Sequence, residues 1–216
     1  MFSKSDIQTK LQESFNPKFE SLGFGLIAHP KYMQYKKAFH GGFQSCIFTI
    51  LERNKTFWIE TNIGVRIDIV EKLANQFTLT LKDYHNESQT VMSTYGRIMG
   101  QPYFRFKVQT QEELDLAFEK IYAFLIEIAF DFMTDNSQVA AVDKLINRYP
   151  EKPSRFMFNE SHRCIKGVII ARMADNPQLP TLIKAYHVVL QRHSLRDKML
   201  PQYKKLVDYL SAFSVN

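Results

Sequence analysis

Apolar and polar residues alternate most regularly between residues 56 and 67, in the stretch TFWIETNIGVRI. Successive side chains of an extended chain point to opposite faces, so this pattern predicts a β-strand with one buried face. The apolar face carries Phe57, Ile59, Thr61, Ile63, Val65 and Ile67. The opposite face carries Trp58, Glu60, Asn62, Gly64 and Arg66. We therefore expect this strand to anchor a sheet whose second face is polar.

Similar extended segments flank this anchor strand. They are predicted at residues 24–39, 43–51, 90–98 and 103–108. The first should form one or two strands, because Pro30 interrupts it and proline is confined to strand edges and bends. Residues 52–55 should join the anchor strand to its predecessor through a four-residue loop built on a type I turn. Gly100 is expected at the centre of a second hairpin.

Much of the remaining chain shows helical periodicity, with apolar residues recurring every three or four positions. Helices are predicted at residues 4–22, 68–77, 110–133, 138–148, 160–174, 177–193 and 201–213. Pro17 should kink or split the first helix, since an interior proline removes a backbone hydrogen bond. Gly23 should end that helix. Thr110 and Glu113 have the spacing of a capping box at the start of the longest helix.

The helix predicted at residues 110–133 suggests how the parts are assembled. Its second half is apolar on nearly every side, so it must be covered on every side. We expect it to lie between the sheet and the C-terminal helices. The segment YPEKPSR, residues 149–155, predicts a boundary between a sheet domain, 1–148, and a helical C-terminal subdomain, 149–216, packed on it. The predicted class is α+β, with an antiparallel sheet of about five to seven strands packed by helices.

Charge is distributed unevenly along the 216 residues. Residues 1–150 carry equal numbers of basic and acidic side chains, whereas residues 151–216 carry 11 Lys and Arg against 5 Asp and Glu, the whole net charge of +6. Such asymmetry indicates an acidic protein partner or a nucleic acid, and a solvated basic surface is the alternative. The candidate contact residues are Arg163, Lys166, Arg192, Arg196 and Lys198. No run that interleaves aromatic and basic residues for base stacking is apparent.

Motifs that carry catalysis are missing from the sequence. It has no glycine-rich phosphate loop, no H-E-x-x-H zinc motif and no G-x-S-x-G nucleophile motif, so we expect no cofactor and no metal. Cys46 and Cys164 lie far apart, and we interpret them as buried free thiols in a reducing compartment. If the polar face of the anchor strand lines a concavity, it provides a candidate ligand or partner face. That face carries Trp58, Glu60, Asn62 and Arg66.

No segment is predicted to contact a membrane. The longest apolar run, residues 123–133, is interrupted by Glu127 and Asp131 and is too short to span a bilayer. The first residues are polar and lack the apolar core of a signal peptide. We therefore expect a cytoplasmic protein.

A resemblance to a known group of proteins begins in the first helix. The residues that carry it are Phe15, Pro17, Phe19, Leu22, Gly23 and Phe24. With the strands predicted after them, they resemble an uncharacterised bacterial α+β domain family whose members have a helix, a Leu-x-Gly-Phe motif and a curved sheet. The motif is one residue tighter here, and the resemblance covers roughly the first 130 residues. Some such families resemble immunity proteins, which neutralise bacterial toxins, although a fold does not fix a function.

Three functional hypotheses follow. The first is a non-catalytic protein-interaction module, immunity-like in the sense of the resemblance, with an acidic protein as partner. The second is a nucleic-acid-binding protein that uses the basic C-terminal helices. The third is an enzyme with its site on the open sheet face near Trp58, Glu60 and Arg66, which requires a pocket there.

Overall fold

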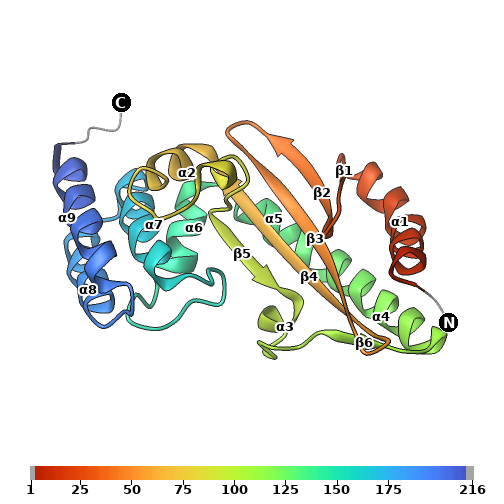
Figure 1. Ribbon diagram of the computed structural model, residues 1–216. Coiled ribbons are helices and arrows are strands. Elements are labelled where there is room, and N and C mark those ends of the chain that lie inside the picture. The colour runs from red at the N-terminus through yellow and green to blue at the C-terminus, as the bar shows by residue number, and fades with distance from the viewer. Residues whose placement is uncertain (1–2, 213–216) are drawn as a thin grey trace. The chain divides into compact units, whose positions relative to one another are not determined.

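The computed structural model describes residues 3–212 and confirms the α+β class, with a helical C-terminal region (Figure 1). Its antiparallel sheet has the strand order β1-β2-β3-β4-β5, and β6 also pairs with β4. The strands are β1 (Gly25–His29), β2 (Tyr32–Phe39), β3 (Gly42–Arg53), β4 (Thr56–Ile67), β5 (Val91–Thr94) and β6 (Phe106–Val108). The anchor strand predicted from the alternating pattern is β4, with the predicted bounds.

Helices account for most of the rest of the described chain. The α-helices are α1 (Lys4–Ser21), α2 (Asp68–Ala74), α3 (Tyr95–Ile98), α4 (Gln111–Phe124), α5 (Phe130–Asp135), α6 (Val139–Ile146), α7 (Glu160–Met173), α8 (Leu179–Gln191) and α9 (Arg196–Ala212). A short 3₁₀ segment covers Lys82–Tyr84, and a π-helical segment, Leu125–Ala129, joins α4 to α5. Phe213, the predicted end of the last helix, lies outside the described residues.

The chain packs into two compact units, each built from two stretches of sequence. The first unit contains the residues up to Val65 together with Ser93–Asp135. The second contains Arg66–Met92 together with the residues from Asn136 onward. These units are defined by the contacts between residues, whereas the expected boundary between residues 148 and 149 divides the chain along its sequence. That boundary stays a prediction.

The first unit is built around a cluster of aromatic rings. Phe19 of α1 is fully buried and stacks on Tyr35 of β2, with 3.9 Å between the ring centroids. Its edges meet Phe24 and Phe130, each with centroids 5.4 Å away. Phe130 begins α5, so this cluster joins α1, the sheet and the long helix. The expected contact of that helix with the C-terminal helices stays a prediction.

Local sequence rules explain both ends of α1. The Ser3 hydroxyl accepts a hydrogen bond from the Asp6 backbone N–H, and Asp6 accepts one from Ser3 in return, which is a capping box. Gly23 has a φ of +82°, and the Phe24 N–H donates to the Phe19 carbonyl, as in a Schellman ending. Of the kink or split predicted at Pro17, the split is wrong, because α1 continues through this residue.

Two predicted turns differ from the structure. Asn54 and Lys55 form a two-residue loop between β3 and β4, with φ values of 52° and 59°. Positive φ at both positions matches a type I′ turn, whose twist suits paired strands, so the four-residue loop was wrong. The second hairpin was also wrong. Strands β5 and β6 both pair with β4, and α3 lies between them in the chain.

In the second unit, α7 is the central helix. It packs against α2, α6, α8 and α9, and residues along almost its whole length are buried. Gly167 lets α8 approach closely, since a Cβ atom built there would lie 2.5 Å from the Tyr186 ring. The unit therefore depends on one helix that carries both apolar and charged side chains into the interior.

Candidate functional site

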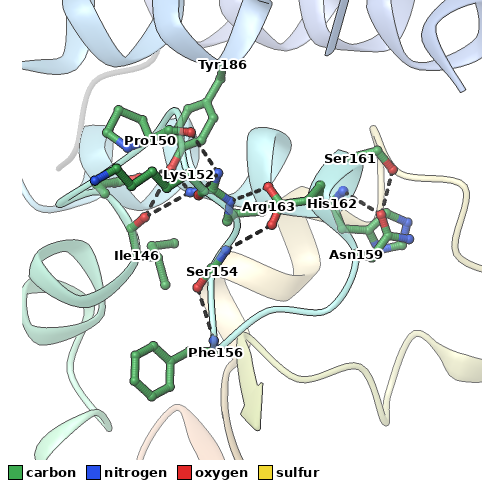
Figure 2. A network of polar contacts seen from close by, with 12 residues as sticks. Ile146, Pro150, Lys152, Ser154, Phe156, Asn159, Ser161, His162, Arg163 and Tyr186 are labelled. Atoms are coloured by element: carbon green, nitrogen blue, oxygen red, sulfur yellow. Dashed lines mark hydrogen bonds and ion pairs between the residues drawn. The ribbon is translucent and has the colours of Figure 1, made fainter. Parts of the chain in front are cut away.

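A buried arginine organises the polar contacts at one end of α7. Arg163 is only 1% exposed, and its Nε donates to the Glu160 carboxylate over 2.8 Å (Figure 2). One terminal nitrogen donates to the backbone carbonyls of Pro150 and Lys152, over 2.7 and 2.8 Å. The other donates to the Ile146 carbonyl over 3.3 Å. Arg163 thus holds the segment after α6 in a defined conformation.

The network extends to the neighbouring helices. The Tyr186 hydroxyl of α8 donates to the Asn147 side-chain oxygen over 2.6 Å, and burial raises the pKa of this tyrosine. The Asn147 amide donates in turn to the Asp143 carboxylate and to the Gly167 carbonyl, over 2.7 and 3.0 Å. Because these buried polar groups satisfy one another, the backbone between α6 and α7 is fixed by several elements at once.

A pocket of about 550 Å³ lies against this fixed segment. Five of its lining residues are basic, and no acidic residue lines it within the described part of the chain. The basic residues are Lys144, Arg148, Lys152, Arg155 and Arg163. Arg163 is committed to the buried network, whereas the other four are exposed. We call this site the basic pocket.

Two cations of the basic pocket cover an aromatic ring. The Arg148 guanidinium and the Lys152 ammonium each lie 5.2 Å from the centroid of Tyr149. Cation–π contacts of this kind hold long side chains near one position. The pocket therefore presents positive charge, and its tyrosine is already in contact with that charge.

A second buried charge cluster lies elsewhere in the same unit. Lys166 of α7 and Glu71 of α2 form an ion pair with 2.8 Å between Nζ and Oε1, and neither is more than 7% exposed. Burial pushes the pKa of Glu71 upward, but the Lys166 ammonium, with help from Ser88 and Arg66, outweighs it and lowers the pKa. Burial and the Lys166 charge lower the pKa of nearby His162 to about 4. This cluster locks α2 to α7.

The structure separates the five cations that were expected to contact a polyanion. Arg163 and Lys166 lie in the interior, paired with Glu160 and Glu71. Arg192, Arg196 and Lys198 are exposed around the start of α9. Arg196 pairs with Asp197 over 3.0 Å. Three of the five thus remain available to a partner at the surface.

The four residues expected on the open sheet face are also divided. Trp58, Glu60 and Asn62 belong to the first unit, where the Asn62 amide lies 3.4 Å from the Glu60 carboxylate and Glu60 pairs with Arg105. Arg66 belongs to the second unit and is 4% exposed. It donates to the Asp68 carboxylate and to the carbonyls of His85 and Ser88.

The basic pocket was missed at the sequence level. Lys144 and Arg148 precede the basic third of the chain, and Lys152 and Arg155 lie in the segment interpreted as a boundary and were not among the candidate contacts. The cluster NRYPEKPSR already contains three of these cations, and this was the available indication. Their convergence, however, depends on the Arg163 contacts, which join residues 11 to 17 positions apart.

No family model matches the chain, and neither the curated proteins nor the solved structures give a significant match. Within residues 3–212, no three side chains of His, Cys, Asp or Glu gather in a way that would hold a metal ion. None of the helices described here has both the length and the hydropathy needed to span a membrane.

Proposed function

We propose that the protein is a non-catalytic interaction module that binds an acidic segment of a partner protein in the basic pocket. The observation that carries the proposal is the convergence of Lys144, Arg148, Lys152 and Arg155 on one cavity with no acidic lining residue among those described. Charge complementarity of this kind steers association and sets specificity. The immunity-like role suggested by residues 15–24 is one form of this function.

The backbone under the pocket supports binding of a defined partner. Arg163 fixes the carbonyls of Pro150 and Lys152, so the cations project from a segment that is already ordered. A pre-organised site loses less conformational entropy when it binds. The Cys46 and Cys164 thiols are both free and buried, which supports our placing the interaction in the reducing cytoplasm.

An acidic protein fits this pocket better than a nucleic acid does. Bases bind single-strand sites largely by stacking on open aromatic faces. Tyr149 is 51% exposed, but Arg148 and Lys152 each lie 5.2 Å from its ring centroid, so a stacking base would compete with these cations, whereas carboxylates can pair with them. Binding of nucleic acid through Arg192, Arg196 and Lys198 stays a prediction of its own.

A charge-reversal experiment tests the proposal. The probe is a fluorescein-labelled peptide with a run of Asp and Glu, titrated by anisotropy at low ionic strength. The full chain should bind it, and the double variant Arg148→Glu/Lys152→Glu should bind about tenfold or more weakly, because two attractive contacts become repulsive. Added salt should weaken binding to the unchanged protein.

The matched control is Arg192→Glu/Lys198→Glu, which makes the same charge change at exposed positions that do not line the pocket. It should keep most of the affinity of the unchanged chain. Equal losses in both double variants would show that only net charge matters, and would overturn the proposed site. Circular dichroism of both variants establishes that the helices remain folded.

A further inference from the structure

Aromatic and basic side chains meet on the polar face of β4 and β6. Trp58 pairs with Lys107 across these strands, so their side chains lie side by side on one face. The neighbouring pairs, which include Phe57 with Val108, point to the buried face. The segment before β6 adds Tyr103 and Arg105 at the same alternating spacing as Lys107.

Trp58, Tyr103 and Arg105 line an open cavity. It has a volume of about 360 Å³ and is lined by Leu51, Arg53, Trp58, Tyr103 and Arg105. Leu51 and Arg53 come from the end of β3, just before the two-residue turn. We call this surface, together with Lys107, the Trp58 patch. All of its residues belong to the first unit.

The rings of the Trp58 patch are open to solvent. Tyr103 is 94% exposed, and Trp58 is partly exposed beside it. An exposed tyrosine next to a tryptophan places two aromatic faces at the surface. Hydration of this apolar area is unfavourable, and the rings add nothing to the core. This contrasts with Tyr149 of the basic pocket, whose ring has two cations over it.

Positive charge surrounds these rings. Arg53 and Lys107 are exposed, and Arg105 is 46% exposed. The Glu60 carboxylate accepts a hydrogen bond from the Nε of Arg105 and so orients its guanidinium. Three cations against one paired carboxylate leave the patch positive. Open rings and cations together are what single-stranded nucleic acids require, because bases stack on the rings and phosphates pair with the cations.

We propose that the Trp58 patch binds single-stranded nucleic acid, with bases stacked on Trp58 and Tyr103 and the backbone held by Arg53, Arg105 and Lys107. An acidic peptide would satisfy the cations but offers no planar base for two open rings. This site lies on a different unit from the basic pocket, so it adds a second binding activity and does not depend on the first.

The single tryptophan of the chain makes the test direct, because intrinsic tryptophan fluorescence reports only on Trp58. The full chain is titrated with a twelve-residue oligothymidylate and, separately, with oligouridylate at low salt. Stacking should quench the fluorescence to saturation. Tyr103→Ala should weaken binding roughly 5- to 150-fold, the range that base–aromatic stacking implies. Arg53→Ala should reduce the slope of log K against log salt concentration by about 1, because one phosphate contact is lost.

The matched control is Tyr149→Ala, which removes a half-exposed tyrosine flanked by cations in the basic pocket. It should leave oligonucleotide affinity unchanged. The proposal is overturned if neither oligonucleotide quenches Trp58 at low salt, or if Tyr103→Ala binds as tightly as the unchanged chain. Equal quenching by polyglutamate, which has no bases, would identify the partner of this patch as an acidic protein and would also overturn it.

Because Tyr103 is almost wholly exposed, its replacement removes little packing, and a loss of binding cannot be attributed to unfolding. The outcome is also separable from that of the basic pocket. Arg148→Glu/Lys152→Glu should keep Trp58 quenching while losing the acidic peptide, and Tyr103→Ala should do the reverse.

Discussion

The two compact units bury different kinds of side chain. The interior of the first unit is dominated by stacked and edge-on rings around Phe19, and its buried polar side chains are uncharged. All five charged side chains that are buried in the described residues lie in the second unit. They are Arg66, Glu71, Asp143, Arg163 and Lys166. The first interior relies on apolar area, and the second also relies on compensated charge.

This difference shows what the buried charges do. Arg66 and Arg163 each donate to the backbone carbonyls of a neighbouring segment, and Lys166 donates to the Gln89 carbonyl. Desolvation makes such groups costly, so they give little net stability but strongly disfavour alternative arrangements of their partners. In the second unit, Arg66, Arg163 and Lys166 hold segments that lie between the longer helices and strands, at residues 85–89 and 150–152.

The largest effect is expected in the aromatic interior. Phe19→Ala should lower the free energy of unfolding by an amount at the upper end of about 3–5 kcal/mol, because the ring is fully buried and contacts several others. Denaturant titration measures this cost. Since no charge is involved, the cost should be the same at pH 5 and pH 7. A marked pH dependence would contradict the proposed contrast between the units.

A smaller cost is expected for removing one partner of the buried ion pair. Lys166→Met should lower the free energy of unfolding by about 3 kcal/mol at pH 7, because Glu71 loses its buried counter-charge. In the unchanged protein, Lys166 lowers the pKa of Glu71, so the Glu71 carboxyl is easier to protonate in Lys166→Met. Protonation removes the uncompensated charge, so the loss of stability caused by Lys166→Met should shrink as the pH falls.

The double variant Lys166→Met/Glu71→Gln should recover part of this loss, since no uncompensated charge remains in the interior. Lys198→Met is the matched control, because it removes an exposed lysine of the same unit, and it should change stability by less than about 0.5 kcal/mol. Similar losses at Lys198 and Lys166 would show that the buried pair has no special role.

The smallest expected effect is on the pH dependence of stability. The folded protein protonates His162 near pH 4, because burial and the Lys166 charge lower its pKa, whereas the unfolded chain takes up this proton near 6.5. The unfolded state therefore binds more protons between these values, and stability falls as the pH falls from 6.5 to 4. His162→Gln should flatten that part of the profile.

Denaturant midpoints at half-unit pH steps measure this slope. His40→Gln, at an exposed histidine in a turn of the first unit, is the control and should keep the slope of the unchanged chain. The loss of stability below pH 4.5 should persist in His162→Gln, because Glu71 contributes stability above its unfolded pKa that is lost as it protonates. An unchanged slope in His162→Gln would contradict the assignment.

Much of the regular structure follows from local sequence. Strand β4 was predicted with its observed bounds because alternation with period two has one geometric solution. The capping box of Thr110 and Glu113 was also predicted, since both hydrogen bonds lie within four residues. By contrast, the type I′ turn at Asn54 and Lys55 was missed, because its conformation depends on the twist of the two strands that it joins.

The candidate sites were much harder to predict than the strands. Arg163 and Lys166 were expected at the surface, since basic residues on a helix are usually solvated, yet specific partners compensate both of them in the interior. In the Trp58 patch, Trp58, Lys107 and Arg53 come from three separate segments. Tyr103, Arg105 and Lys107 do alternate along one segment, but Trp58 and Arg53 join them only across strands.

The sequence by itself determined the α+β class, the main strands and helices, and the excess of positive charge in the last third of the chain. Each of these depends on composition or on periodicity within one segment. The tertiary structure decided which cations are buried and which are offered to a partner, and where open rings meet positive charge. Desolvation and hydrogen-bond partners settle these questions, and the partners of Arg163 and Lys166 lie up to 95 residues away in the chain.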